Sequence, residues 1–211
     1  MKNQLQHWNH AHEQHWLSAH SQKQTAFAEE VNRQLHPHAK MLELGCGEGN
    51  DSLYFAKEGH TVIATDFSDV VIAENNKRLT HPSLSFRIQD ISQPLEFNDG
   101  HFDAVYARLS LHYFTDEVTV RIFREIVRVL IPGGHLFFMC KEVSDPIYGK
   151  GEKIEDDMFE LDGHVRHFFS EPYVRKLLDM SGLQLQSLEA SHELIYDRHS
   201  AFIKAVATKP A

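Results

Sequence analysis

The chain has 211 residues, 42% of them hydrophobic and 24% charged, which is ordinary for one globular domain with a substantial core. The formal net charge of −9 argues against broad binding to nucleic acid or to an anionic membrane, because such binding depends on basic surfaces. No apolar run approaches the ~20 residues of a membrane span, and the polar N-terminus lacks a signal-peptide core. The two cysteines, Cys46 and Cys140, lie in an apolar strand end or a glycine turn, which indicates reduced thiols and a cytoplasmic protein.

The first 39 residues are expected to be helical. Residues 3–20 form an amphipathic helix pattern, and a second helix is expected over 22–35. Four large or titratable side chains share the apolar face of the first helix: Trp8, His12, His15 and Trp16. Because two indoles need a surface to cover, we expect 1–39 to act as a lid over a ligand site in the rest of the chain. Packing elsewhere on the domain, or a dimer contact, would produce the same pattern.

Strand and helix patterns alternate from residue 40 onward. Apolar strands are expected at 40–44, 61–65, 84–88, 102–106 and 135–140, and helices at 51–58, 69–79, 116–130 and 170–181. The segment 141–169 has no clear periodicity, and two strands at 183–189 and 202–208 follow with no helix between them. This order predicts one domain, 40–211, with a doubly wound α/β fold, helices on both faces of a parallel sheet and a final antiparallel pair.

The strongest local pattern is the stretch MLELGCGEGN, from Met41 to Asn50. An apolar strand runs into Gly45, Gly47 and Gly49 and then directly into a helix. Glycines let the backbone turn sharply and approach a ligand closely, and the helix supplies free N–H groups and the positive end of its dipole. At the end of a first strand, such a turn marks the ligand crevice of a doubly wound fold. A tight turn that binds nothing would carry the same glycines, so the other motifs decide the reading.

Five motifs, taken in order over residues 40–209, resemble those of the class I S-adenosylmethionine-dependent methyltransferases. They are Glu43-Leu44-Gly45-Cys46-Gly47-Glu48-Gly49, Asp66 after the second strand, Asp90-Ile91 after the third, Phe102 through His112-Tyr113 at the fourth, and Leu130-Ile131-Pro132-Gly133-Gly134 before the fifth. The resemblance implies a Rossmann-like seven-stranded sheet with six parallel strands and a C-terminal antiparallel strand. It also implies S-adenosyl-L-methionine as cofactor, with S-adenosyl-L-homocysteine as product. Trp8, Trp16 and the short chain are similar to small cytosolic enzymes related to tellurite-resistance and thiopurine methyltransferases.

The resemblance assigns cofactor contacts to residues at the ends of four strands: Glu43, Gly45, Cys46, Gly47, Gly49, Asp66, Phe67, Asp90, Ile91, Ala107 and Arg108. It implies that Glu43 lies near the methionyl amino group and that Asp66 accepts hydrogen bonds from the ribose hydroxyls. Phe67, Asp90 and Ile91 would meet the adenine. A backbone carbonyl of Ala107 or Arg108 would meet the methionyl ammonium.

His112, with Tyr113 beside it, is the candidate catalytic residue because it follows the fourth strand at the mouth of the crevice and titrates near neutrality. A role in packing or in shaping the substrate site fits His112 equally well. A small-molecule acceptor is expected, and a thiol or chalcogen, an amine or a carboxylate is compatible with the motifs. Further candidates for the acceptor site are Trp8, His12, His15, Trp16 and Tyr196. A monomer or a homodimer is expected.

Two other functions fit part of the pattern. Gly45-x-Gly47-x-x-Asn50 is one residue away from the dinucleotide fingerprint, which would indicate an NAD(P)-dependent oxidoreductase, but Asn50 is large for close helix–strand packing. A regulatory protein that binds S-adenosylmethionine without turnover would keep all the cofactor motifs. We expect no metal site, because the dense N-terminal histidines point in different directions and neither cysteine has a partner at metal spacing.

Overall fold

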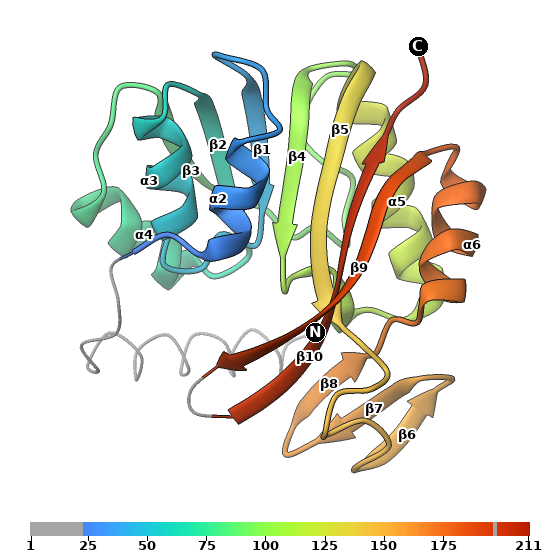
Figure 1. Ribbon diagram of the computed structural model, residues 1–211. Coiled ribbons are helices and arrows are strands. Elements are labelled where there is room, and N and C mark those ends of the chain that lie inside the picture. The colour runs from blue at the N-terminus through green and yellow to red at the C-terminus, as the bar shows by residue number, and fades with distance from the viewer. Residues whose placement is uncertain (1–22, 196–197) are drawn as a thin grey trace.

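The computed structural model describes residues 23–195 and 198–211 (Figure 1). The helices are α2 (Ala26–Asn32), α3 (Asn50–Lys57), α4 (Asp69–Arg78), α5 (Asp116–Val129) and α6 (Glu171–Ser181), with a 3-10 turn η1 (Leu111–Tyr113). The strands are β1 (Lys40–Leu44), β2 (Thr61–Asp66), β3 (Leu84–Ile88), β4 (Phe102–Arg108), β5 (Leu130–Lys141), β6 (Glu152–Glu155), β7 (Met158–Leu161), β8 (His164–His167), β9 (Gln184–Ile195) and β10 (Arg198–Thr208). The helix predicted over 3–20 lies outside the described residues.

The main sheet has seven strands in the order β3-β2-β1-β4-β5-β10-β9. β1 to β5 pair in parallel, whereas β10 is antiparallel to both β5 and β9. The predicted fold class, with its one antiparallel strand, is therefore confirmed. The strand order reverses between β1 and β4, so the carboxyl ends of these two strands form the switch point at which doubly wound folds bind ligands.

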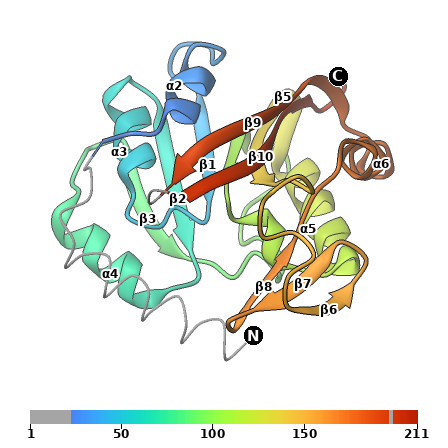
Figure 2. The ribbon, with the colours of Figure 1, turned by 60° about the horizontal axis from the view of Figure 1, so that its bottom comes forward.

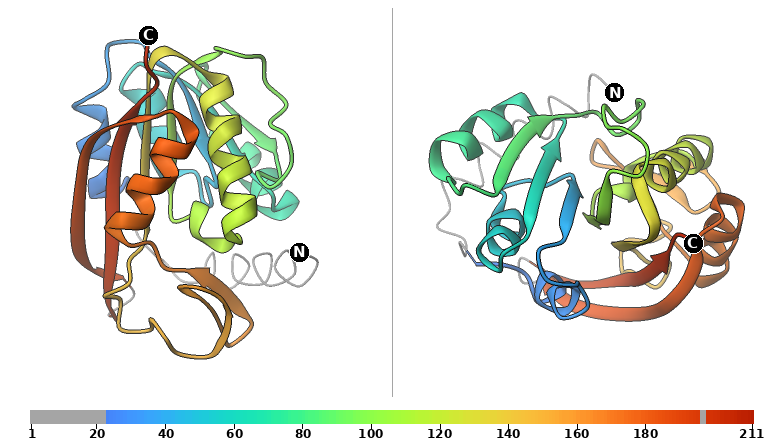
Figure 3. Two further views of the ribbon diagram at one scale, coloured as in Figure 1. Left: turned by 90° about the vertical axis from the view of Figure 1, so that its right-hand side faces the viewer. Right: turned by 90° about the horizontal axis from the view of Figure 1, so that it is seen from above.

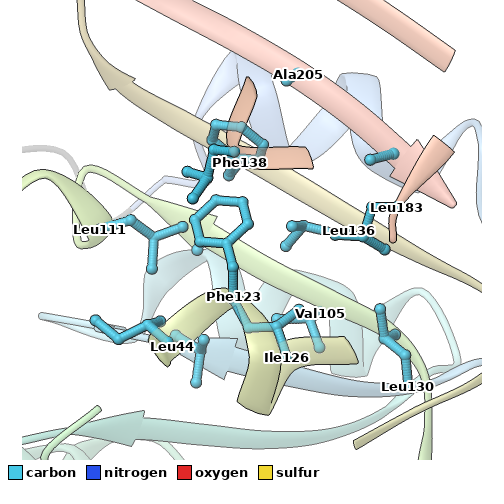
Figure 4. Packing of buried hydrophobic residues seen from close by; sticks show 14 of the residues in the cluster. Leu44, Val105, Leu111, Phe123, Ile126, Leu130, Leu136, Phe138, Leu183 and Ala205 are labelled. Carbon is cyan, nitrogen blue, oxygen red and sulfur yellow. The ribbon is translucent and has the colours of Figure 1, made fainter. Parts of the chain in front are cut away.

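Helices cover both faces of this sheet (Figures 1 and 3). One core cluster joins α2, α3 and α4 to the sheet through residues such as Phe27, Phe55 and Ile72. The other face packs against α5 and α6, and its buried residues include Phe123, Phe138, Ile126, Leu136 and Leu183 (Figure 4). The helix termini follow their sequence signals, since the Ser68 hydroxyl caps α4 by accepting from Val71 N, and Gly182 ends α6 with φ +75°.

The segment from 141 to 169, which has no periodicity, differs from a simple loop. It contains the small antiparallel sheet β6-β7-β8, whose strands have four residues each. All of β6 is exposed, so its pattern lacks the alternation that marks a half-buried strand. Three aromatic rings, Tyr148, Phe159 and Phe168, pack together beneath the small sheet.

The last two strands are also longer than predicted. In the β9–β10 pair, the first partners are Gln184 and Thr208 and the last are Ile195 and Arg198. The pairing of β10 with β5 ends earlier, at Phe202 and Lys141. The β9–β10 hairpin therefore extends past the carboxyl end of β5, on the same side of the sheet as the β6–β8 sheet (Figures 1 and 2). Both additions border the switch point. None of the described helices is long and apolar enough to cross a membrane.

Candidate active site

The glycine turn after β1 is packed so closely that two of its positions exclude a side chain. Gly45 has φ +76°, and a Cβ there would lie 2.5 Å from Ser110 Cβ. Ser110, in the turn after β4, donates from its hydroxyl to Leu44 O at 2.6 Å. Gly49 has φ +73°, and a Cβ there would lie 2.8 Å from the Phe86 ring. These glycines are needed for the turn itself, because Gly45 lets it approach the segment after β4 and Gly49 lets it approach β3.

Four backbone amides of this turn are bonded within the protein. Gly45 N and Cys46 N donate to Thr65 O at 2.8 and 2.9 Å, and Gly49 N donates to Cys46 O at 3.0 Å. Gly47 N donates to Oδ2 of Asp66 at 3.0 Å. A diphosphate, which dinucleotide folds hold with such amides, would have to displace these bonds. The geometry therefore disfavours the dinucleotide interpretation.

Asp66 is buried at the end of β2, as predicted. Besides Gly47 N, its carboxylate accepts from Ser68 N at 3.0 Å through Oδ1. Both bonds hold the carboxylate in one orientation at the crevice. A carboxylate has about four acceptor positions, so two backbone donors leave room for the two hydroxyls of a ribose. The structure therefore fits the role that the resemblance assigns to Asp66.

Three buried carboxylates gather around the glycine turn: Glu43, Asp51 and Asp66. Glu43 Oε2 accepts from the Ser52 hydroxyl at 2.5 Å. Burial raises the pKa of Glu43 well above its ordinary value, and the charge of Asp51 raises it further. A ligand that brings positive charge to this place would relieve both effects, whereas an anionic ligand would add repulsion.

Asp51 connects α3 to two other elements and was not singled out by sequence reasoning. Its Oδ1 accepts from Thr25 N at 2.7 Å, and its Oδ2 accepts from the Thr25 hydroxyl at 2.8 Å and from the Tyr106 hydroxyl at 2.7 Å. The end of the crevice is thereby tied to the start of α2 and to β4. Asn75 was also missed; its side-chain amide donates to Gly47 O at 2.7 Å and fixes the turn from α4.

The residues predicted to contact the methionyl group, Ala107 and Arg108, lie at the end of β4. Ala107 is fully buried and Arg108 is half-buried, with its Nε enclosed and without a hydrogen bond among the described residues. Leu109 follows with φ +56°, a conformation that costs a non-glycine residue roughly 1–3 kcal/mol. Leu109 N donates to Met139 O at 2.8 Å, which holds the strained turn in place. Strain of this kind is frequent at functional sites.

His112 lies in η1, directly after this turn, and is only 1% exposed. Its Nδ1 has no hydrogen-bond partner among the described residues, and its ring lies 4.3 Å from the ring of Tyr113. Burial lowers the pKa of His112 well below the ordinary value, and the charges of Arg166 and Lys141 lower it further. The imidazole is thus neutral at pH 7 and has a nitrogen free to accept a proton or a hydrogen bond.

The residues predicted to meet the adenine lie at the ends of β2 and β3. Phe67 is half-buried, and Ile91 packs into the core. Asp90 Oδ1 accepts from the backbone N and the hydroxyl of Ser92 at 2.9 and 2.7 Å. β3 is thereby joined to the crevice, because Gln89 N donates to Asp66 O at 2.9 Å.

The acceptor residues predicted at the N-terminus, and Tyr196, lie outside the described residues: Trp8, His12, His15, Trp16 and Tyr196. In the described ranges, no three His, Cys, Asp or Glu side chains are grouped closely enough to hold a metal ion. Both cysteines are buried free thiols, and burial raises the pKa of each well above its ordinary value. Neither thiol is therefore a ready nucleophile.

Comparison with known proteins finds similarity over the part of the chain that carries these residues. Residues 42–138 match the model of a methyltransferase domain family. The matched segment contains β1 to β4 and most of β5, and with them the glycine turn, Asp66, Asp90 and His112. Over this segment, 97 of the 211 residues, the chain is similar to the class I S-adenosylmethionine-dependent methyltransferases. S-adenosylmethionine is the cofactor of this family, and the three carboxylates around the glycine turn fit its sulfonium and ammonium charges.

Among relatives of this methyltransferase chain, phosphoethanolamine N-methyltransferase 1 of Triticum aestivum is 37% identical over 100 residues, 46% of this chain and 20% of that protein. The chain spans between 20% and 47% of the length of the first curated relatives that it matches. A methyltransferase structure from Methanosarcina mazei is 20% identical with a TM-score of 0.76, covering 89% of this chain and 99% of that one. The Burkholderia thailandensis 1,6-didemethyltoxoflavin-N1-methyltransferase, solved with its substrate and S-adenosylhomocysteine, is 22% identical with a TM-score of 0.67, covering 88% and 79%. Both structures have the same fold.

Proposed function

We propose that the protein transfers a methyl group from S-adenosylmethionine to a small-molecule acceptor. The cofactor assignment rests on two observations at the glycine turn. Four of its amides already form hydrogen bonds within the protein, and three buried carboxylates lie around it: Glu43, Asp51 and Asp66. A cation suits this place and a diphosphate does not. A small-molecule acceptor is supported by two relatives that are named after their acceptors, phosphoethanolamine and 1,6-didemethyltoxoflavin.

Each group of cofactor-binding residues is proposed to contact a different part of S-adenosylmethionine. Asp66 accepts from the ribose hydroxyls, Phe67 and the Asp90-Ile91 pair hold the adenine, and the backbone of Gly45, Cys46, Gly47 and Gly49 lies against the methionyl group. Glu43 and the carbonyl of Ala107 or Arg108 receive the methionyl ammonium. When bound, the cofactor supplies a methyl group on a positively charged sulfur, which reacts by in-line displacement, so the chain mainly positions the acceptor and excludes water.

His112 is the proposed catalytic residue, with Tyr113 beside it. Its neutral, buried imidazole accepts a hydrogen bond or the proton from the nucleophilic atom of the acceptor, and Nδ1 is free for this. A thiol or chalcogen needs little such help, whereas an amine needs more. The first 39 residues are proposed to close over the acceptor, and the proposed acceptor contacts are Trp8, His12, His15, Trp16 and Tyr196. The protein is proposed to act in the cytoplasm, as a monomer or a homodimer.

Calorimetry with S-adenosylmethionine, S-adenosylhomocysteine and NAD tests the cofactor. Binding of S-adenosylhomocysteine without a response to NAD is expected, and the reverse result would overturn the proposal. Production of S-adenosylhomocysteine from a panel of thiols, metalloid oxyanions, amines and carboxylic acids then tests turnover. A protein that binds the cofactor tightly but methylates none of these classes would favour a non-catalytic binding protein.

A further inference from the structure

Two segments that carry basic side chains, the end of β5 and the strand β8, pack against η1, which holds the buried His112. Lys141 ends β5, and Arg166 and His167 end β8, which packs against η1. Backbone hydrogen bonds hold the two segments together, because Phe169 N donates to Lys141 O at 2.8 Å and Val143 N donates to Phe169 O at 3.3 Å. The small β6–β8 sheet thus carries Arg166 to the carboxyl end of the main sheet, beside His112.

The charges of Lys141 and Arg166 differ in how they are balanced. Lys141 Nζ forms a buried ion pair of 2.6 Å with Asp145, and Asp145 Oδ2 also accepts from Ala201 N at 2.9 Å. Arg166 is half-buried, and its side chain forms no ion pair or hydrogen bond with any residue in 23–195 or 198–211. A half-buried guanidinium without a counter-ion is costly, and it is unexpected in a chain with a net charge of −9.

The acidic groups near this region lie on another side. Asp116, Glu155 and Asp157 line a cavity of about 460 Å³ together with His167, and neither His112 nor Arg166 lines it. Two of these acids have partners already, since Glu155 accepts from Asp116 N at 3.1 Å and Asp157 accepts from the Tyr148 hydroxyl. Among residues 23–195 and 198–211, none of these acids forms an ion pair with Arg166.

We propose that Arg166 and His112 form an acceptor subsite for small molecules that carry an anionic group, a carboxylate or a phosphate, near the atom to be methylated. The inference rests on the proposed function and names the substrate class of the same site. Arg166 pairs with the anionic group through its planar set of donors, which matches either oxyanion. His112 accepts from the nucleophilic atom, so the two residues bind different parts of one acceptor. The ion pair of Lys141 with Asp145 holds the end of β5 next to the subsite.

The first test is a titration with inorganic phosphate, and separately with acetate, followed by the histidine ring signals in nitrogen–proton NMR spectra. The His112 signals are identified by their absence in His112→Gln. A saturable shift of these signals is expected in the full-length protein. Losing one charged hydrogen-bonding partner is worth about 1.5–3 kcal/mol, so Arg166→Ala should weaken the response about tenfold or more. Arg166→Lys should keep part of the response. Arg175→Ala replaces an exposed arginine of α6 and should respond like the wild type. If neither phosphate nor acetate shifts the His112 signals, the subsite is overturned. If both do, the anion that binds more tightly is the preferred one.

The second test uses pairs of acceptors in which one member carries an anionic group and the other does not: 3-mercaptopropionate with 3-mercapto-1-propanol, and phosphoethanolamine with ethanolamine. Arg166→Ala should raise KM for the anionic member about tenfold or more with a smaller change in kcat, and should change KM much less for the member without the anionic group. Equal losses for both members would mean a structural role and would overturn the inference. Wild-type protein that fails to bind S-adenosylhomocysteine counts against the proposed function. A missing anion response in a protein that does bind it counts against this subsite alone, and the NMR result stands whether or not these acceptors are methylated.

Discussion

The hydroxyl of Tyr106 in β4 donates to Oδ2 of Asp51 in α3 over 2.7 Å, although 55 residues separate the two in the chain. The same carboxylate accepts from the backbone N and the hydroxyl of Thr25, which caps α2. One buried carboxylate therefore fixes three elements, α2, α3 and β4, beside the glycine turn. Burial raises the pKa of Tyr106 well above its ordinary value, and the Asp51 charge adds to this, so the phenol stays a donor.

Tyr106→Phe should lower the free energy of unfolding by about 1.5–3 kcal/mol, because it removes a buried hydrogen bond to a charged group. Tyr148→Phe is the matched control: the same hydroxyl is lost, but Tyr148 is 38% exposed, and a change within about 0.5 kcal/mol is expected. Urea unfolding followed by circular dichroism measures both. Equal losses in the two variants would contradict a special role for the Asp51 link.

Gly45→Ala should destabilise the protein and abolish cofactor binding. Two costs add: a left-handed backbone, roughly 1–2 kcal/mol for a non-glycine residue, and the overlap of the new Cβ with Ser110. Gly100→Ala separates them, since Gly100 has φ +57° but nothing within 4 Å of the new Cβ. Unfolding curves of the two variants give the steric part by difference. A Gly45→Ala protein no less stable than Gly100→Ala would show that the turn can shift away from Ser110.

Asp66→Ala should weaken S-adenosylhomocysteine binding by about 1–3 kcal/mol, roughly 5- to 150-fold, because it removes an acceptor for the ribose. Some of the loss will come through the turn, since Asp66 also accepts from Gly47 N. Asp69→Ala, on the exposed start of α4, is the control and should change affinity less than twofold. Calorimetry measures all three proteins. Unchanged affinity in a folded Asp66→Ala protein would remove Asp66 from the site.

The sequence was sufficient for those parts of the site in which a residue type is required by the backbone. Gly45 and Gly49 could be recognised because only glycine fits their positive φ and close contacts. Asp66 could be recognised because it follows a clear apolar strand. The fold followed from the same regularity, since strand and helix alternate over most of the chain from residue 40 and the last two strands have no helix between them.

Contacts between distant segments could not be predicted in this way. Asp51 resembles any acidic residue in the first turn of a helix, and Tyr106 resembles a core residue of β4, so neither signals the bond between them. The β6–β8 sheet escaped prediction because its strands are four residues long and mostly exposed. Arg166 was missed with it. Its importance depends on the absence of a counter-ion among residues 23–195 and 198–211, which sequence does not reveal.

Acidification should expose the cost of burying His112. Its pKa in the folded protein lies well below the ordinary 6.5, first because of burial and then because of Arg166. Below about pH 6.5 the unfolded chain therefore takes up a proton that the folded protein refuses. The free energy of unfolding then falls as pH drops, by up to about 1.4 kcal/mol per pH unit for one proton. Above that window His112 contributes no slope.

His112→Gln should remove this one proton, so the stability of the variant relative to the wild type should rise steadily from pH 7 to pH 5 and stay constant from pH 7 to pH 8. Burial also lowers the pKa values of His60, His101, His135 and His167, but these act in both proteins and cancel in the difference. His192→Gln, on exposed β9, controls for the loss of any histidine and should run parallel to the wild type. Urea unfolding at half-unit pH steps measures the three curves. Parallel curves for His112→Gln and the wild type would mean that His112 takes up its proton in the folded protein as readily as in the unfolded chain, and the neutral acceptor nitrogen beside Arg166 would be lost with it.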